Sequence, residues 1–279
     1  MVTKAPAPVR RDEAMRRGAE LFLEGDDSPV AIAVNGEPIT RARIESNRAD
    51  AEFRRSLMQE MLEEPEHHHP PMEMYNEAFV ELIDEFGTEN VGLAVALVNT
   101  AIQVYAGEND LQATEQQIDE AMEQQRETHD MIEQQDPEAA AAVGAALIDV
   151  IGEERYWEEY LPEVLSASIT DQNVDRAAWE AADVEPEPGE MFQLERERFL
   201  AEFRADLVRE ADIEIADASA LGDADLDRAI EYITDAYPAL QQERIERQRQ
   251  LEENQTNRVS PGQPDFGVSS NSEFTHTSS

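Results

Sequence analysis

The 279-residue sequence has no cysteine, no long uninterrupted apolar run and little positive charge, and each scarcity excludes a class of protein. Without cysteine the chain cannot form disulfides, and no thiolate can act as a nucleophile or as a metal ligand. The longest apolar stretch, residues 91–105, is interrupted by Asn99 and Gln103 and is too short to cross a bilayer. The motifs Gly-x-Ser-x-Gly, Gly-Lys-Ser/Thr and Gly-x-Gly-x-x-Gly are also missing. We therefore expect no enzyme, no cofactor and no membrane insertion.

Positive charge is scarce as well, since 63 acidic residues face 22 basic ones and leave a net charge of -41. Such a surface repels nucleic acid and anionic membranes, so neither is expected as a partner. All basic residues except Lys4 are arginine, and this bias with abundant acid is typical of halophilic proteins. An acidic protein from a GC-rich mesophile is the alternative. In about 1 M salt the Debye length is about 3 Å, which screens the carboxylates from one another.

The first 25 residues carry four arginines, but their only apolar run is Leu21-Phe22-Leu23. The core of a signal peptide is much longer than three residues. The sequence therefore predicts a soluble chain with no visible signal peptide. It would be cytoplasmic as written, or extracytoplasmic if an export signal has been removed from its start.

Helical periodicity runs through most of the chain, with two short strand patterns near its ends. Residues 30–34 (Val-Ala-Ile-Ala-Val) form a β-branched run that ends at Asn35-Gly36, a pair suited to a turn. Ile213 and Ile215 alternate with acidic residues in a second strand pattern. Residues 89–106 are apolar on most helical faces, which predicts the central helix of a bundle.

Capping and breaking residues divide the rest of the chain. Thr40 is expected to cap a helix that runs to residue 62, and Thr114 with Gln117 forms a capping box. A helix is expected to begin at Asp136-Pro137, and the helical segment 153–182 to bend near Pro162. Prolines predict a loop at 63–71 and a hinge at 184–189. Four segments result: a peripheral charged helix (1–27), a helical domain (28–216), a C-terminal amphipathic helix capped by Asp223 (217–254) and a disordered tail (255–279).

The strand at 30–34, followed by Asn-Gly-Glu-Pro-Ile-Thr at 35–40 and a helix, resembles the opening of the SurA and PrsA family of foldases. Segments like 111–122, 169–174 and 207–215 follow in that family, so the resemblance covers about residues 28–216. It implies an all-α lobe similar to the SurA N-terminal domain, with a minimal two-stranded ribbon that pairs 30–34 with 212–215. The family's parvulin isomerase domain is missing after Trp179. The resemblance therefore implies a chaperone that binds unfolded or extended polypeptides without ATP and without prolyl isomerase activity.

Methionine and aromatic side chains supply candidate contacts for such a polypeptide, because methionine adapts to varied partners and aromatic rings give rigid amphipathic contact. Each of them is equally suited to an ordinary place in the core. The candidate peptide-binding residues are Met72, Met74, Tyr75, Phe79, Tyr156, Trp157, Tyr160, Trp179 and Phe192.

Two other functions compete with peptide binding. A structural or adaptor protein would associate through the helix at 223–254, and this includes a homo-oligomer, although the apolar heptad positions fade after Ile245. A diverged isomerase is the third possibility. His67-His68-His69 is a candidate for binding a transition metal, but the flanking prolines splay consecutive side chains apart. We therefore assign no metal site.

Overall fold

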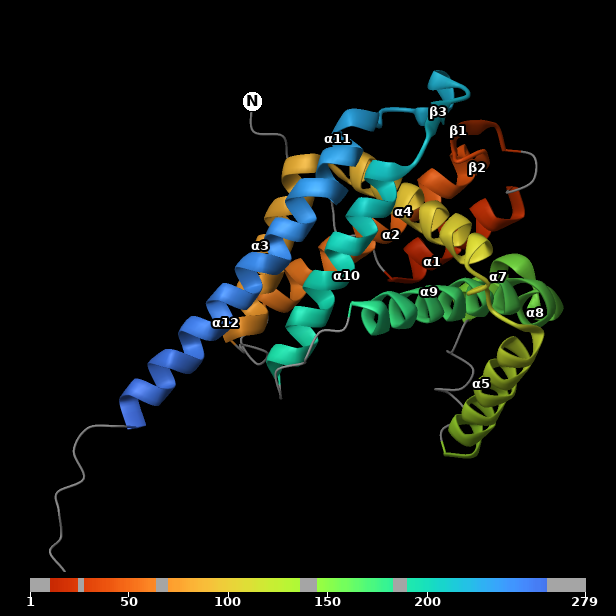
Figure 1. Cartoon of the computed structure of the whole chain (residues 1–279). Helices are drawn as coiled ribbons and strands as arrows, with labels where there is room; N and C mark the ends of the chain where they lie inside the picture. Colours follow the sequence, from red (N-terminus) through yellow and green to blue (C-terminus); the bar gives the residue numbers. More distant parts are fainter. Residues whose placement is uncertain (1–10, 25–27, 64–69, 136–144, 183–189, 260–279) are drawn as a thin grey trace, which may run out of the picture.

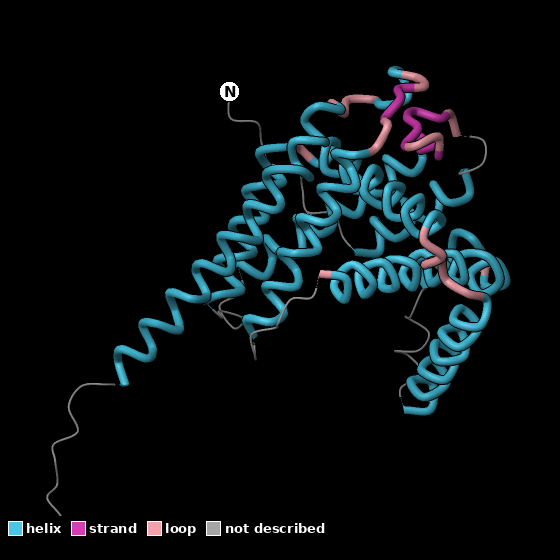
Figure 2. Tube along the Cα trace, viewed as in Figure 1, coloured by secondary structure: helices cyan, strands magenta, loops and turns pink. Residues whose placement is uncertain are grey.

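Helices dominate the computed structural model, which describes residues 11–24, 28–63, 70–135, 145–182 and 190–259 (Figures 1 and 2). A small sheet lies at one end of the helical body (Figure 2). In chain order the elements are α1 (Arg11–Glu24), β1 (Val30–Val34), β2 (Glu37–Thr40), α2 (Arg41–Glu63), α3 (Pro70–Phe86), α4 (Thr88–Glu108), α5 (Glu115–Gln135), α7 (Ala145–Ile151), α8 (Glu153–Arg155), the π-turn η3 (Tyr156–Tyr160), α9 (Leu161–Ala181), α10 (Glu190–Glu210), β3 (Ile213–Ile215), the 3₁₀ turn η4 (Ala218–Leu221), α11 (Leu226–Glu231), the π-turn η5 (Tyr232–Ala236) and α12 (Tyr237–Val259).

Helix α4 is the core of the bundle, as its apolar sequence predicts. It packs against α2, α10, α9 and α11, and Leu93, Ala94 and Leu97 are fully buried. Gly87, with φ of 83°, separates α4 from α3. By length and composition alone α4 is a candidate membrane span, but most of its apolar window is buried inside the bundle. This is the burial expected of a core helix.

The sheet has three antiparallel strands in the order β2-β1-β3. The predicted pairing of 30–34 with 212–215 is confirmed, since Ile32 lies opposite Ile215 and Val34 opposite Ile213. The prediction of a ribbon with only two strands was wrong, because residues 37–40 pair with β1 as a third strand. Asn35 and Gly36 have φ of 50° and 85°, as in the two-residue turn of a hairpin. Pro38 is tolerated in β2 because β2 is an edge strand.

The N-terminal helix α1 was predicted to be peripheral, but it packs against the rest of the helical body. It contacts α2 and α7, and Ala19 is fully buried. With Leu147 and Ile151 of α7, Ala19 forms a second, smaller apolar cluster beside the main core. Charge on the exposed face of α1 obscured this small apolar stripe in the sequence.

The C-terminal helical segment begins and ends later than predicted. Asp225 rather than Asp223 is the cap, since its side chain accepts a hydrogen bond from the backbone nitrogen of Arg228 at 3.2 Å. The helix then passes through η5 and continues to Val259, so residues 255–259 are helical and not part of a disordered tail. Tyr232 and Leu240 belong to the same core as α4. The C-terminal segment and the helical domain therefore share one core.

Local signals predicted several helix boundaries correctly. The oxygen of the Thr40 side chain accepts from the backbone nitrogen of Arg43 at 3.3 Å, and Thr114 and Gln117 cap one another reciprocally at 3.0 and 3.3 Å. Just before Pro162 the helix widens into η3, in which Leu161 bonds back five residues to Tyr156. The His67–His69 tract, the hinge at 184–189 and the helix start at 136–137 lie outside the described residues.

Candidate functional site

A cleft with a volume of about 430 Å³ lies among α2, α3, α4, α10 and η5, with one residue from α9 and one from α12. Its rim is open to solvent, since the side chains of Asp50 and Arg54 are 51% and 62% exposed. Its size falls within the range of about 300–1,000 Å³ that is usual for ligand pockets. The lining residues are Asn47, Asp50, Ala51, Arg54, Met58, Tyr75, Phe79, Ile83, Val91, Val95, Val98, Asn99, Asp171, Ala201, Arg204, Tyr232, Ile233 and Tyr237.

One wall of the cleft is aromatic. Tyr75 and Phe79, one turn apart on α3, have ring centroids 5.9 Å apart, and Tyr232 and Tyr237 have centroids 6.1 Å apart. Arg244 of α12 lies 4.3 Å above the Tyr75 ring and holds it in place by a cation–π contact. Burial raises the pKa of the Tyr237 hydroxyl to about 12 and also raises that of Tyr232. Both hydroxyls therefore remain protonated donors at neutral pH.

The charged groups of the cleft balance one another. Two aspartates and two arginines line it. Arg54 pairs with Asp50 at 2.7 Å, and Arg204 binds both carboxylate oxygens of Asp175 at 2.8 and 2.9 Å. Burial raises the pKa of the Asp171 carboxyl, an effect that the nearby Arg204 partly offsets. The cleft is thus nearly neutral in a protein whose net charge is -41.

Two donors in the cleft wall lack partners. The side-chain nitrogen of Asn47 and the Nε of Arg204 are shielded from solvent and make no hydrogen bond. Buried donors without acceptors are rare in native proteins and mark a place of strain or of function. Both residues line the same cleft, although neither of these two atoms is exposed to its interior.

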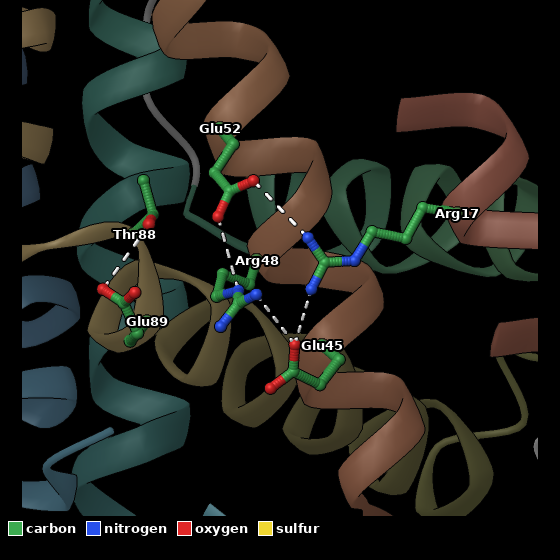
Figure 3. Close-up of polar contacts among 6 residues, drawn as sticks. All are labelled: Arg17, Glu45, Arg48, Glu52, Thr88 and Glu89. Carbon is green, nitrogen blue, oxygen red and sulfur yellow. Dashed lines mark hydrogen bonds and ion pairs between the residues drawn. The ribbon is translucent and has the colours of Figure 1, made fainter. Parts of the chain in front are cut away.

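Close helix packing and an ion-pair network position the α2 wall of the cleft. At Gly92 of α4 the backbone of α2 approaches so closely that a Cβ there would lie 2.6 Å from the nitrogen of Arg48. Figure 3 shows that Arg17 of α1 and Arg48 share two acids of α2, Glu45 and Glu52. The distances are 3.0 and 3.7 Å from Arg17, and 3.2 and 3.4 Å from Arg48. Because a helix repeats every 3.6 residues, this network occupies a different face of α2 from the cleft.

The predicted peptide-binding residues fall into separate places, and among those whose side chains the structure describes only Tyr75 and Phe79 line the cleft. The side chains of Met72 and Met74 lie outside the described residues, although both positions belong to α3. The remaining candidates, Tyr156, Trp157, Tyr160, Trp179 and Phe192, lie away from the cleft.

Two aromatic clusters hold those remaining candidates. Tyr156 and Tyr160 pack in the smaller apolar cluster, with Phe22 of α1 5.1 Å from Tyr160, and Trp157 lies against Tyr156. Trp179 packs between Phe192 and Phe199 at 5.8 and 5.3 Å and joins α9 to α10. These contacts give both clusters a role in packing helices together.

Sequence reasoning missed the polar groups of the cleft and its second pair of tyrosines. Tyr232 and Tyr237 follow the apolar periodicity of an ordinary amphipathic helix, so no local pattern distinguishes them. Asp171 and Arg204 are single charged residues among many, and only the packing of α9 on α10 brings them to one cavity. Asp171 and Arg204 can therefore be identified as cleft residues only from the three-dimensional structure.

Among the described residues no cluster of three or more histidine or acidic side chains is arranged to hold a metal ion. No protein-family model, no curated protein and no solved structure matches this chain. The cleft is therefore the main basis for inferring a function.

Proposed function

We propose that the protein is a holding chaperone that binds unfolded or extended polypeptide in the cleft, without ATP and without prolyl isomerase activity. The observation that carries the proposal is a cavity open at its rim, in which aromatic and aliphatic side chains alternate with polar ones, in a protein that is otherwise strongly acidic. Concave sites of this size that combine apolar side chains with a few polar groups are typical of binding pockets. The resemblance of residues 28–216 to the SurA and PrsA family supports the same function.

The composition of the cleft favours a polypeptide as its occupant. Met58 adapts its shape to different side chains, and Tyr75 offers a rigid ring with a polar tip. Apolar contact of this kind gives affinity without a strict sequence requirement. A chaperone needs this combination, because its clients share exposed apolar side chains and not one motif.

Substitution of Tyr75 by alanine tests the proposal. The wild-type chain is expected to suppress aggregation of an unfolded client at near-stoichiometric ratios without nucleotide, and Tyr75→Ala to weaken client binding by about tenfold or more, as loss of an aromatic anchor does. Binding is measured by fluorescence anisotropy of a labelled client.

Trp179→Ala is the matched control, because Trp179 is a half-buried aromatic residue outside the cleft lining. It should lower the midpoint of thermal unfolding and leave client affinity nearly unchanged. Equal loss of affinity in both variants, or unchanged client aggregation at a tenfold excess of wild type, would contradict the cleft as the binding site.

An adaptor role remains the second candidate because α12 extends beyond α3 and α10 in Figure 1. The apolar residues Leu240 and Ile245 are already buried inside the chain, so they offer little surface to another copy. Association would then depend on the polar end of α12. A stable oligomer in sedimentation, combined with no holding activity, would favour the adaptor over the chaperone.

A further inference from the structure

We infer that the cleft recognises the main chain of an extended segment together with one uncharged apolar side chain, so that the hydrogen-bonding groups of the cleft wall select extended over helical clients. This inference rests on the proposed function, because it specifies what part of a polypeptide the same cleft holds. Its basis is the juxtaposition of unpartnered donors, accepting groups and an aromatic wall around one cavity.

Existing ion pairs in the cleft disfavour a charged side chain as the occupant. Arg54 is paired with Asp50 and Arg204 with Asp175, so a bound carboxylate or ammonium would have to compete with an existing ion pair. Asp171 lies in surroundings that disfavour its own charge. A neutral side chain avoids these costs, and the aromatic wall of Tyr75, Phe79 and Tyr232 favours an apolar one.

The unpartnered donors require an acceptor that an apolar side chain does not have. The amide nitrogen of Asn47 and the Nε of Arg204 lack partners and are shielded from water. A main-chain carbonyl oxygen of the occupant is such an acceptor, and rotation of the Asn47 side chain, a change common on binding, brings its amide to that oxygen, whereas Arg204 stays paired with Asp175. A purely apolar ligand would leave the Asn47 amide unsatisfied.

Accepting groups in the same wall complete the match to a peptide group. Asp171 and Asn99 line the cleft and offer oxygens to main-chain N–H groups of the occupant. A helical segment cannot use these partners, because most of its N–H and C=O groups bond to one another. An extended segment has all of them free, as an unfolded chain does.

Three versions of one fluorescent peptide test the inference on the full chain. The peptide has a central leucine within a neutral Ser/Gly sequence, and its two variants carry either N-methyl groups on the amides that flank leucine or lysine in place of leucine. We expect each change to weaken binding to the wild type by about tenfold, since N-methylation removes main-chain donors and a lysine ammonium loses its hydration on entering the cleft. Equal affinity of the N-methylated and unmodified peptides would overturn main-chain recognition while leaving the proposed function intact.

Asn47→Leu provides a readout that a merely structural residue would not give. Leucine has a similar shape and removes the unpartnered amide, so the midpoint of thermal unfolding should stay the same or rise. Affinity for the unmodified peptide should nevertheless fall several-fold, whereas binding of the neutral apolar dye Nile red should not change. A parallel loss of dye and peptide binding would contradict the inference. No binding of the unmodified peptide to wild type would overturn the proposed function together with it.

Discussion

At the scale of single residues, Gly92 permits a close approach of two helices. Gly92 allows α4 to lie against the backbone of α2, and a Cβ at this position would lie 2.6 Å from the nitrogen and 2.8 Å from the Cα of Arg48. Backbone atoms cannot rotate away as a flexible side chain can. Any side chain at position 92 therefore forces the two helices apart and disturbs the wall of the cleft.

Gly92→Ala is expected to destabilise the protein by about 1–3 kcal/mol, the usual cost of an overpacked core. Gly107→Ala is the matched control in the same helix, because the nearest atom to its Cβ is the side-chain amide nitrogen of Gln112 at 3.4 Å. Alanine has a higher helix propensity than glycine by up to about 1 kcal/mol, so this control should be neutral or stabilising. Urea unfolding of both variants measures the difference. Similar stability of the two variants would refute the close contact.

A second residue-scale prediction concerns Asp171, whose pKa burial raises. An acid with a raised pKa in the folded state stabilises the fold only below its unfolded pKa of about 4, and this contribution is lost as pH rises through the folded value. Asp171→Asn should therefore be more stable than wild type at about pH 7, by less than about 1 kcal/mol because solvent reaches the group.

The stability difference between Asp171→Asn and wild type should shrink as pH falls toward about 4, where the aspartate is increasingly protonated. Guanidinium unfolding at several pH values measures it. A difference that is constant with pH would mean that Asp171 is not held in surroundings that disfavour its charge. Stability gained with loss of peptide affinity would indicate a residue kept for binding.

At the scale of elements, the sequence correctly predicted those features that depend on residues close together in the chain. The capping pairs at Thr40 and Thr114–Gln117 are confirmed because a cap requires only residues three positions apart. The central helix α4 is confirmed because apolar residues on most faces leave no surface for water. The pairing of β1 with β3, more than 170 residues apart, was implied by the family resemblance and not by any local pattern.

The missed elements share a physical reason, which is that their neighbours in space decide them. Strand β2 contains a proline and is short, and only its place at a sheet edge makes the proline acceptable. The polar side of the cleft forms only where side chains of α9 and α10 come together with side chains of α2. Periodicity in one segment contains no information about these encounters.

At the scale of the whole molecule, the net charge of -41 opposes compact folding. Many of the ion pairs join residues three or four positions apart on one helix, such as Arg155 with Glu159 and Arg198 with Glu202. Exposed pairs of this kind contribute about 0.3–0.5 kcal/mol each and leave most carboxylates unpaired. We therefore expect repulsion among the unpaired acids to be the dominant electrostatic effect on stability.

The midpoint of thermal unfolding should accordingly rise markedly between low salt and about 1 M potassium chloride, where the Debye length falls to about 3 Å. Salt weakens the few exposed attractions as well as the many repulsions, and the large excess of acid makes the net effect stabilising. Calorimetry or circular dichroism at increasing salt measures the midpoint. Sucrose at matched water activity is the control, because it stabilises folded proteins by exclusion from their surface without screening charge. A midpoint that rises no more in potassium chloride than in sucrose would contradict the interpretation of the acidic surface as an adaptation to concentrated salt, and it would leave the fold and the proposed cleft unaffected.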